Sequence, residues 1–174
     1  MIDTEDKKYL YFLSYIKGNK SSVMKFYNKL RHCKIVNNVN DIPNNEVLCI
    51  SGHYNSYKLL ELLQLHNDYE ILKSRINENT LKYIGICSGL QILLDKIKDE
   101  FSDNIINGLN IIQDVTIIKR KNPSIGFIND KFYCHSFNLY NTKGEIINEY
   151  IKKNVIAYQY HPENSNYPNI DIFL

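Results

Sequence analysis

The sequence lacks tryptophan, any long apolar run and any strong excess of one charge. Its 174 residues include 21 Lys and Arg against 19 Asp and Glu, for a formal net charge of +2. So balanced a chain does not predict the broad electrostatic attraction that binds nucleic acid or anionic membranes. No apolar stretch approaches the roughly 20 residues that a membrane-spanning helix needs. We therefore expect no nucleic-acid partner and no membrane partner.

Cysteine is scarce and scattered. The four cysteines are Cys33, Cys49, Cys87 and Cys134, and they form no Cys-x-x-Cys pair and no Cys/His cluster with metal-ligand spacing. The first residues, MIDTEDKK, are polar and do not form the apolar core of a signal peptide. This combination favours free thiols over a disulfide framework. We predict a cytoplasmic protein with no metal and no cofactor, where a reducing environment would keep a catalytic thiol reduced.

The order of the predicted elements indicates the fold. Neither a repeat, a low-complexity linker nor a break in composition divides the chain, so we predict a single domain over residues 1–174. Strands are predicted at residues 9–15, 47–50 and 81–86, and helices at residues 21–31, 57–65, 69–76 and 90–97. The second half is predicted to hold strands at residues 109–119, 126–129, 131–137, 145–150 and 155–160. The pattern indicates an α/β fold, a mostly parallel open sheet with helices on both faces, with antiparallel strands in the second half.

A candidate nucleophile follows the predicted strand at residues 81–86. Gly85-Ile86-Cys87-Ser88-Gly89 has the form G-x-C-x-G, the thiol version of a nucleophile elbow. Glycines two before and two after the cysteine would avoid Cβ clashes in the tight turn. The start of the next helix would favour a thiolate, and the N–H of Ser88 would face a developing oxyanion. The alternative is a buried structural cysteine flanked by chance glycines.

A thiol nucleophile needs an imidazole base and a group that orients the imidazole. The histidines are His32, His53, His66, His135 and His161. His161 directly follows a predicted apolar strand, and Pro162 would stiffen the turn that lets Glu163 fold back on the ring. His32 and His66 fall at predicted helices. His135 ends an apolar strand, where it either lines the site or is a satisfied polar group of the core.

Two motifs together resemble the class I, triad-type glutamine amidotransferases, whose fold is flavodoxin-like. Residues 85–91 (GICSGLQ) are similar to the G-I-C-x-G-x-Q motif of that family. Residues 158–163 (YQYHPE) are similar to its Q-F-H-P-E motif, with Tyr160 in place of Phe. Each motif is moderately specific alone, and their order and separation make the pair strong.

The resemblance implies a glutaminase that releases ammonia from L-glutamine. Cys87 would be the nucleophile, His161 the base and Glu163 the orienting carboxylate. The further oxyanion and substrate-binding positions are Gly52, His53, Ser88, Gln91, His135 and Ser136.

Within this family the chain most resembles the glutaminase subunit of imidazole glycerol phosphate synthase. Residues 18–23 (GNKSSV) are similar to its G-N-x-x-S-V segment, and residues 132–137 (FYCHSF) to its Y-F-x-H-S-Y/F segment. The Ser51-Gly52 turn lies where its P-G-V-G oxyanion loop would fall. The resemblance implies a heterodimer in which ammonia passes to a (β/α)8-barrel synthase subunit of histidine biosynthesis.

The chain departs from that pattern in three places, which leaves alternatives open. The oxyanion loop reads SGHY at residues 51–54 and keeps only the first glycine. Residues 123–127 (PSIGF) only weakly match P-H-x-G-W, and few residues remain after Glu163 for the expected helix. One alternative is a paralogous subunit that supplies ammonia for surface-sugar modification. Another is a non-catalytic scaffold subunit, against which the retained Cys, His and Glu argue. The third is a cysteine hydrolase or peptidase, against which the late H-P-E segment argues.

Overall fold

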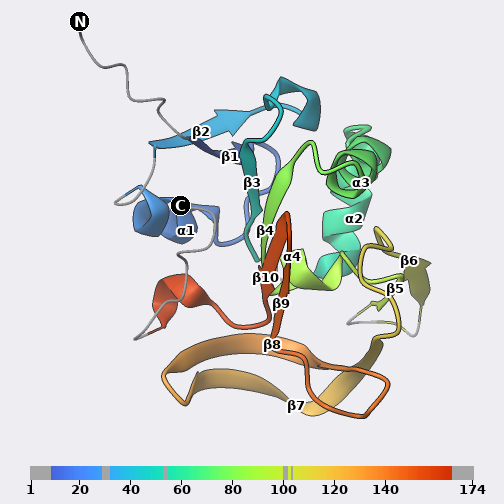
Figure 1. Ribbon diagram of the computed structural model, residues 1–174. Coiled ribbons are helices and arrows are strands. Elements are labelled where there is room, and N and C mark those ends of the chain that lie inside the picture. Colours follow the sequence, from blue (N-terminus) through green and yellow to red (C-terminus); the bar gives the residue numbers. More distant parts are fainter. Residues whose placement is uncertain (1–8, 29–31, 53–54, 100–101, 103, 166–174) are drawn as a thin grey trace, which may run out of the picture.

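A six-stranded sheet forms the centre of the computed structural model, which describes residues 9–28, 32–52, 55–99, 102 and 104–165 (Figure 1). Its strands are β1 (Tyr9–Leu13), β2 (His32–Val36), β3 (Val47–Ile50), β4 (Lys82–Ile86), β9 (Glu149–Lys152) and β10 (Val155–Tyr158). They are ordered β2-β1-β3-β4-β10-β9, and only β9 is antiparallel to its neighbour. The carboxyl ends of five strands therefore share one edge, where α/β sheets place their sites.

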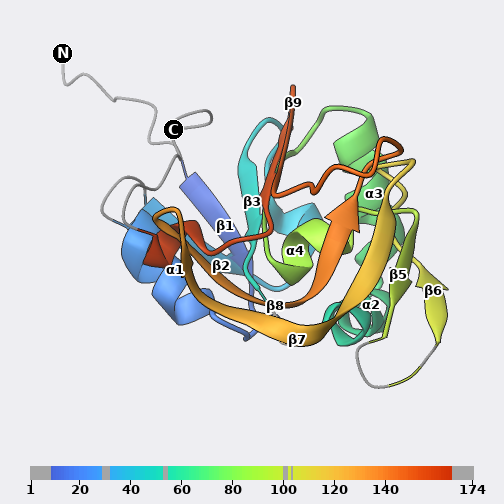
Figure 2. The ribbon, with the colours of Figure 1, turned by 90° about the horizontal axis from the view of Figure 1, so that it is seen from below.

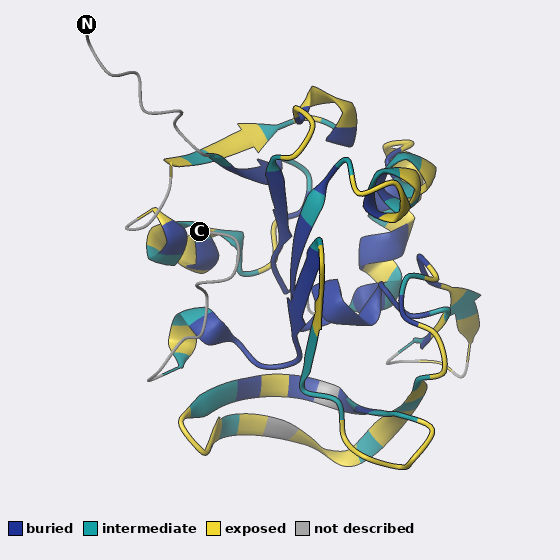
Figure 3. Cartoon of the chain, in the orientation of Figure 1, coloured by how far each residue is buried: buried dark blue, intermediate teal, exposed yellow. Residues whose placement is uncertain are grey.

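Helices cover both faces of this sheet. They are α1 (Lys20–Tyr27) on one face, and α2 (Ser56–Leu65), α3 (Tyr69–Asn77) and α4 (Ser88–Gln91) on the other, with a short 3-10 turn η1 at Val39–Asp41. In β1, Leu10 and Phe12 pack in the core beside α1, while Tyr11 and Leu13 pack in the core beside α2 and α3. Such two-sided burial explains the continuous apolar runs of the central strands, which are dark in Figure 3. The predicted α/β class is confirmed.

Two antiparallel pairs lie outside the main sheet. One is the long hairpin of β7 (Thr116–Ile128) and β8 (Lys131–Tyr140), and the other joins β5 (Lys96–Lys98) to β6 (Ile105–Asn107). The hairpin runs along the end of the sheet at which α4 begins (Figures 1 and 2). It therefore forms a wall at the carboxyl ends of the strands.

The predicted helix at residues 90–97 is wrong beyond Gln91. α4 is only four residues long. The backbone carbonyls of residues 92–94, which would otherwise accept bonds within the helix, instead accept hydrogen bonds from the N–H groups of residues 109–112. A tertiary contact thus ends the helix where local propensity would continue it.

The predicted boundaries need further corrections, among them the strand expected at residues 145–150, which begins only at Glu149. The strand expected at residues 109–119 begins only at Thr116, because its first residues make the bonds to the end of α4. His32 begins the edge strand β2, which the sequence did not predict, and is not helical. His66 follows the last residue of α2. Within the described ranges, none of the helices is long and apolar enough to cross a membrane.

Candidate active site

Cys87 stands in a strained turn between β4 and α4. Its backbone has φ 54° and ψ −109°, a left-handed region that residues with a side chain rarely adopt. Its N–H donates to the carbonyl of Tyr158 at 2.7 Å, which continues the pairing of β4 with β10. The side chain is 8% exposed, and Sγ lies 3.5 Å from the carbonyl oxygen of Cys134. The turn thus places a nearly buried thiol at the edge of the sheet.

The two glycines of the turn are required by close packing. A Cβ on Gly85 would lie 2.6 Å from the carbonyl oxygen of Gly89. A Cβ on Gly89 would overlap the carbonyl oxygen of Ile50 in β3. Any side chain at either position would displace backbone, so the G-x-C-x-G spacing has the steric basis expected of it.

His161 and Glu163 meet across the turn that follows β10. His161 Nδ1 lies 2.9 Å from Glu163 Oε1, and the Glu163 side chain is 1% exposed. The backbone N–H of His161 donates to the Phe132 carbonyl at 2.7 Å, and Ser165 Oγ donates to the His161 backbone carbonyl at 2.8 Å. Pro162 begins the 3-10 turn η2 (Pro162–Asn164). Backbone contacts to the hairpin therefore hold the imidazole in place.

The His161 imidazole lies beside the Cys87 side chain, since a Cβ on Gly52 would be 3.1 Å from His161 Cε1 and 3.3 Å from Cys87 Cβ. Since Nδ1 faces Glu163, Nε2 remains for the sulfur. Burial lowers the pKa of His161, but hydrogen bonds to Cys87 and Glu163, together with their negative charges, outweigh it and raise the pKa to about 10. The arrangement therefore favours a protonated imidazole held between the Cys87 side chain and the Glu163 carboxylate.

Gly52 lies where three side chains of the site meet. A Cβ at this position would be 3.1 Å from His161 Cε1, 3.3 Å from Cys87 Cβ and 3.4 Å from Asn19 Oδ1. The turn that the sequence assigned to oxyanion binding is therefore beside the candidate nucleophile. His53, the next predicted residue, lies outside the described residues.

Asn19 is a site residue with no role predicted from the sequence. Its Nδ2 lies 2.5 Å from Glu163 Oε1 and 2.9 Å from His161 Nδ1. Its backbone N–H donates to the Gly52 carbonyl at 3.0 Å. The only sequence signal was its place in the GNKSSV segment after the first strand.

The remaining predicted residues flank Cys87. Ser88 and Gln91 are buried within α4. His135 is 8% exposed in β8; burial, above all, lowers its pKa to about 4, and its Nδ1 has no hydrogen-bond partner among the described residues. Ser136 lies in β8 by its backbone, and its side chain is outside the described structure.

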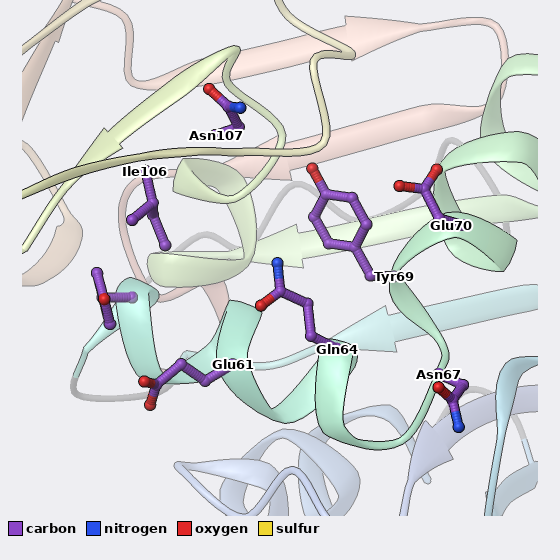
Figure 4. A pocket seen from close by; sticks show the side chains of 8 residues that line it. Glu61, Gln64, Asn67, Tyr69, Glu70, Ile106 and Asn107 are labelled. Carbon is purple, nitrogen blue, oxygen red and sulfur yellow. The ribbon is translucent and has the colours of Figure 1, made fainter.

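A pocket of about 710 Å³ lies elsewhere and contains none of these residues (Figure 4). Its lining is formed by Tyr57, Glu61, Gln64, Asn67, Tyr69, Glu70, Ile106 and Asn107. It is separate from the carboxyl edge that holds the thiol and the imidazole.

Comparison with known proteins agrees with the motifs. Residues 24–146 match the CobB/CobQ-like glutamine amidotransferase domain family. A cobyric acid synthase of Clostridium novyi (strain NT) is 35% identical over 106 residues, which are 58% of this chain but only 21% of that protein. The chain thus spans about a fifth of this curated relative.

Solved structures show similar folds. One glutamine amidotransferase has a TM-score of 0.64 at 14% identity, covering 88% of this chain and 90% of its own. Another, from Thermotoga maritima, has a TM-score of 0.54 at 11% identity, covering 90% of this chain and 76% of its own. Identities this low show the shared fold alone.

Proposed function

The chain belongs to the CobB/CobQ-like glutamine amidotransferase family, and we propose that it hydrolyses L-glutamine to glutamate and ammonia through Cys87, His161 and Glu163. One observation carries the proposal. The thiol in its strained turn lies beside the imidazole at Gly52, and the imidazole Nδ1 is 2.9 Å from the Glu163 carboxylate. Each member has the partner that a nucleophile, a base and an orienting group need.

The proposed reaction has two halves. Cys87 Sγ attacks the side-chain carbonyl carbon of glutamine, and the thiol proton resides on His161. His161 then gives this proton to the leaving nitrogen, the C–N bond breaks, and ammonia leaves a glutamyl thioester. Water attacks the thioester while His161 accepts its proton, and the S–C bond breaks to give glutamate. The proton returns to the sulfur, so the enzyme is restored.

The other predicted residues have supporting roles in this proposal. The oxyanion of each tetrahedral intermediate would accept hydrogen bonds from the Ser88 N–H and from the turn at Gly52 and His53. Gln91, one turn beyond Cys87, and His135 with Ser136 on the hairpin would position the substrate. His135 suits this task because its lowered pKa keeps it neutral near pH 7.

The ammonia would pass to a synthase, since protonation in bulk water removes the nucleophile. The match to about a fifth of a longer synthase supports an acceptor domain beyond the matching region in that relative. For this chain the resemblance points to a (β/α)8-barrel subunit of histidine biosynthesis, with surface-sugar modification as the alternative acceptor pathway. Reconstitution with each candidate synthase, scored by glutamine-dependent product, separates the two.

A diazo-ketone analogue of glutamine, 6-diazo-5-oxo-L-norleucine, tests the proposed chemistry. We expect intact mass to show one adduct, absent from Cys87→Ala and retained in Cys134→Ala, which removes an exposed thiol. The reaction is repeated with each candidate synthase, because glutaminases of this class are often silent alone. A folded protein that takes no adduct under any of these conditions is not a glutaminase, and the scaffold alternative would then hold.

A further inference from the structure

We propose that Asn19 is a positioning residue that holds Glu163 against His161 and joins this pair to the turn at Gly52. The inference rests on the proposed function, because it concerns how the same triad is kept in its active geometry. Asn19 would join Cys87, His161 and Glu163 as a fourth residue of the site, although it is 142 residues away from His161 in sequence.

The contacts of Glu163 show why a second donor matters. Its Oε1 accepts from Asn19 Nδ2 at 2.5 Å and lies 2.9 Å from His161 Nδ1. Its Oε2 has no hydrogen-bond partner among the described residues. Because the carboxylate is 1% exposed, water does little to restrain it. Without Asn19, the only described restraint on this carboxylate is the imidazole that it is meant to orient.

The short contact between Asn19 Nδ2 and His161 Nδ1, 2.9 Å, also has a chemical meaning. Both atoms carry protons when Nδ1–H points at Glu163, so neither can accept from the other. Both then donate to the same Oε1. The carboxylate oxygen is therefore the acceptor that the amide and the imidazole share.

The backbone of Asn19 makes the second connection. Its N–H donates to the Gly52 carbonyl at 3.0 Å, and its carbonyl accepts from Ser22 and Val23 in the first turn of α1. Val23 and Tyr27 of this helix are fully buried against the sheet. A helix anchored in the core therefore carries one residue that contacts both sides of the site.

Alkylation of Cys87 by iodoacetamide, followed by peptide mass mapping from pH 4 to pH 10, tests the inference without requiring glutamine to bind. The titratable groups around His161 are Cys87, Glu163 and His135, with Tyr27 and Cys49 close to Glu163. The midpoint is the pH at which the alkylation rate of Cys87 reaches half its maximum. In Asn19→Ala we expect this midpoint to rise, so that alkylation at pH 6 slows about tenfold, the effect of losing one hydrogen bond to a charged group. Cys134 in the same sample is an exposed reference thiol.

Two further variants separate positioning from folding. Asn154→Ala removes an asparagine whose Nδ2 donates to the carbonyls of Ile76 and Leu81, so we expect it to lower stability and leave the Cys87 midpoint unchanged. Asn19→Asp keeps the side-chain shape and replaces the donor by a second carboxylate, and we expect it to slow alkylation at least as much as Asn19→Ala. A wild-type midpoint in both Asn19 variants would overturn the inference.

The two experiments distinguish failure of the glutaminase proposal from failure of the role proposed for Asn19. If the glutamine analogue never labels wild-type Cys87 but the alkylation midpoint moves in the Asn19 variants, Asn19 positions the triad of a thiol enzyme with another substrate. If the analogue labels the wild type and the midpoint does not move, the glutaminase proposal holds and the role of Asn19 is refuted.

Discussion

The imidazole of His161 and the carboxylate of Glu163 touch across a single intervening residue, with Nδ1 and Oε1 2.9 Å apart. Pro162 lies between them and begins the η2 turn, which brings the two side chains together. The Glu163 side chain is 1% exposed, so its charge has little water around it. A buried carboxylate is stable only when it is paired, and its partner is then held firmly.

Glu163→Gln tests this pairing with little change in shape. We expect labelling of Cys87 by the diazo-ketone analogue to slow by roughly two to four orders of magnitude, as when a triad carboxylate becomes an amide and the imidazole takes the wrong tautomer. The measurement is the second-order labelling rate from intact mass. Wild-type circular dichroism and thermal midpoint would show that the fold is intact. A rate within threefold of wild type would mean that Glu163 does not orient His161.

The stability of the protein should depend on pH through His161. Its pKa in the folded state is raised to about 10, against an ordinary value of 6.5. The charged form is therefore stabilised by folding, fully so below about pH 6.5, and this contribution is lost as the pH rises toward 10. Urea unfolding measures this effect as the difference in free energy of unfolding between wild type and His161→Gln. We expect that difference to shrink by roughly 2–4 kcal/mol between pH 6.5 and pH 10.

His135 provides a contrast of opposite sign. Burial lowers its pKa to about 4, so its contribution is present above pH 6.5 and lost as the pH falls through 4. The wild-type advantage over His135→Gln should therefore shrink on acidification and stay constant from pH 7 to pH 10. If both histidine variants showed the same pH dependence, a general loss of charge balance would explain the data, and the specific pairing of His161 would be refuted.

The parts of the candidate site whose geometry the sequence anticipated are those built from neighbours in the chain. Gly85, Cys87 and Gly89 form one turn, so a short motif describes both the strain and the close packing. His161 and Glu163 are likewise two residues apart. Local sequence determines such units, because their geometry depends on few other contacts.

The parts that sequence reasoning missed depend on distant contacts. Asn19 reaches His161 across 142 residues, and only the folded sheet brings them together. The end of α4 is set by bonds from residues 109–112, which no helical pattern within α4 reveals. β2 reads HCKIV, is half exposed at the edge of the sheet, and so lacks the buried apolar run of a central strand. In each case contacts between distant parts of the chain determine the structure, and local sequence preference does not.

Gly89→Ala should destabilise the protein through a backbone clash. A Cβ there would overlap the Ile50 carbonyl, which belongs to a central strand and cannot move easily. We expect a loss of about 2–3 kcal/mol in the free energy of unfolding by urea, together with loss of Cys87 labelling. Gly144→Ala is the comparison, because a Cβ there meets nothing within 4 Å and costs only the strain of φ 78°, about 1 kcal/mol. Equal losses in the two variants would rule out the clash.

Tyr160→Phe restores the residue found in the resembling motif, and should still cost stability. The Tyr160 hydroxyl donates to Glu149 Oε1 at 2.9 Å, and Lys131 Nζ binds the same oxygen at 2.5 Å. Because Tyr160 is 1% exposed, water cannot replace its bond, and we expect a loss of about 1–2 kcal/mol in urea unfolding. Labelling of Cys87 should stay within twofold of wild type, since the hydroxyl contacts no member of the triad.

A double-mutant cycle decides whether that loss comes from the hydroxyl bond. Glu149→Gln alone removes the charge that both Tyr160 and Lys131 contact. If the bond carries the energy, Tyr160→Phe should cost clearly less in the Glu149→Gln background than in wild type, because a neutral acceptor binds the hydroxyl more weakly. Strictly additive losses would instead mean that the cost of removing the hydroxyl does not come from its bond to Glu149. Ring packing against Tyr133 and Tyr158, at centroid distances of 5.9 and 5.2 Å, is retained in Tyr160→Phe and so cannot account for the loss.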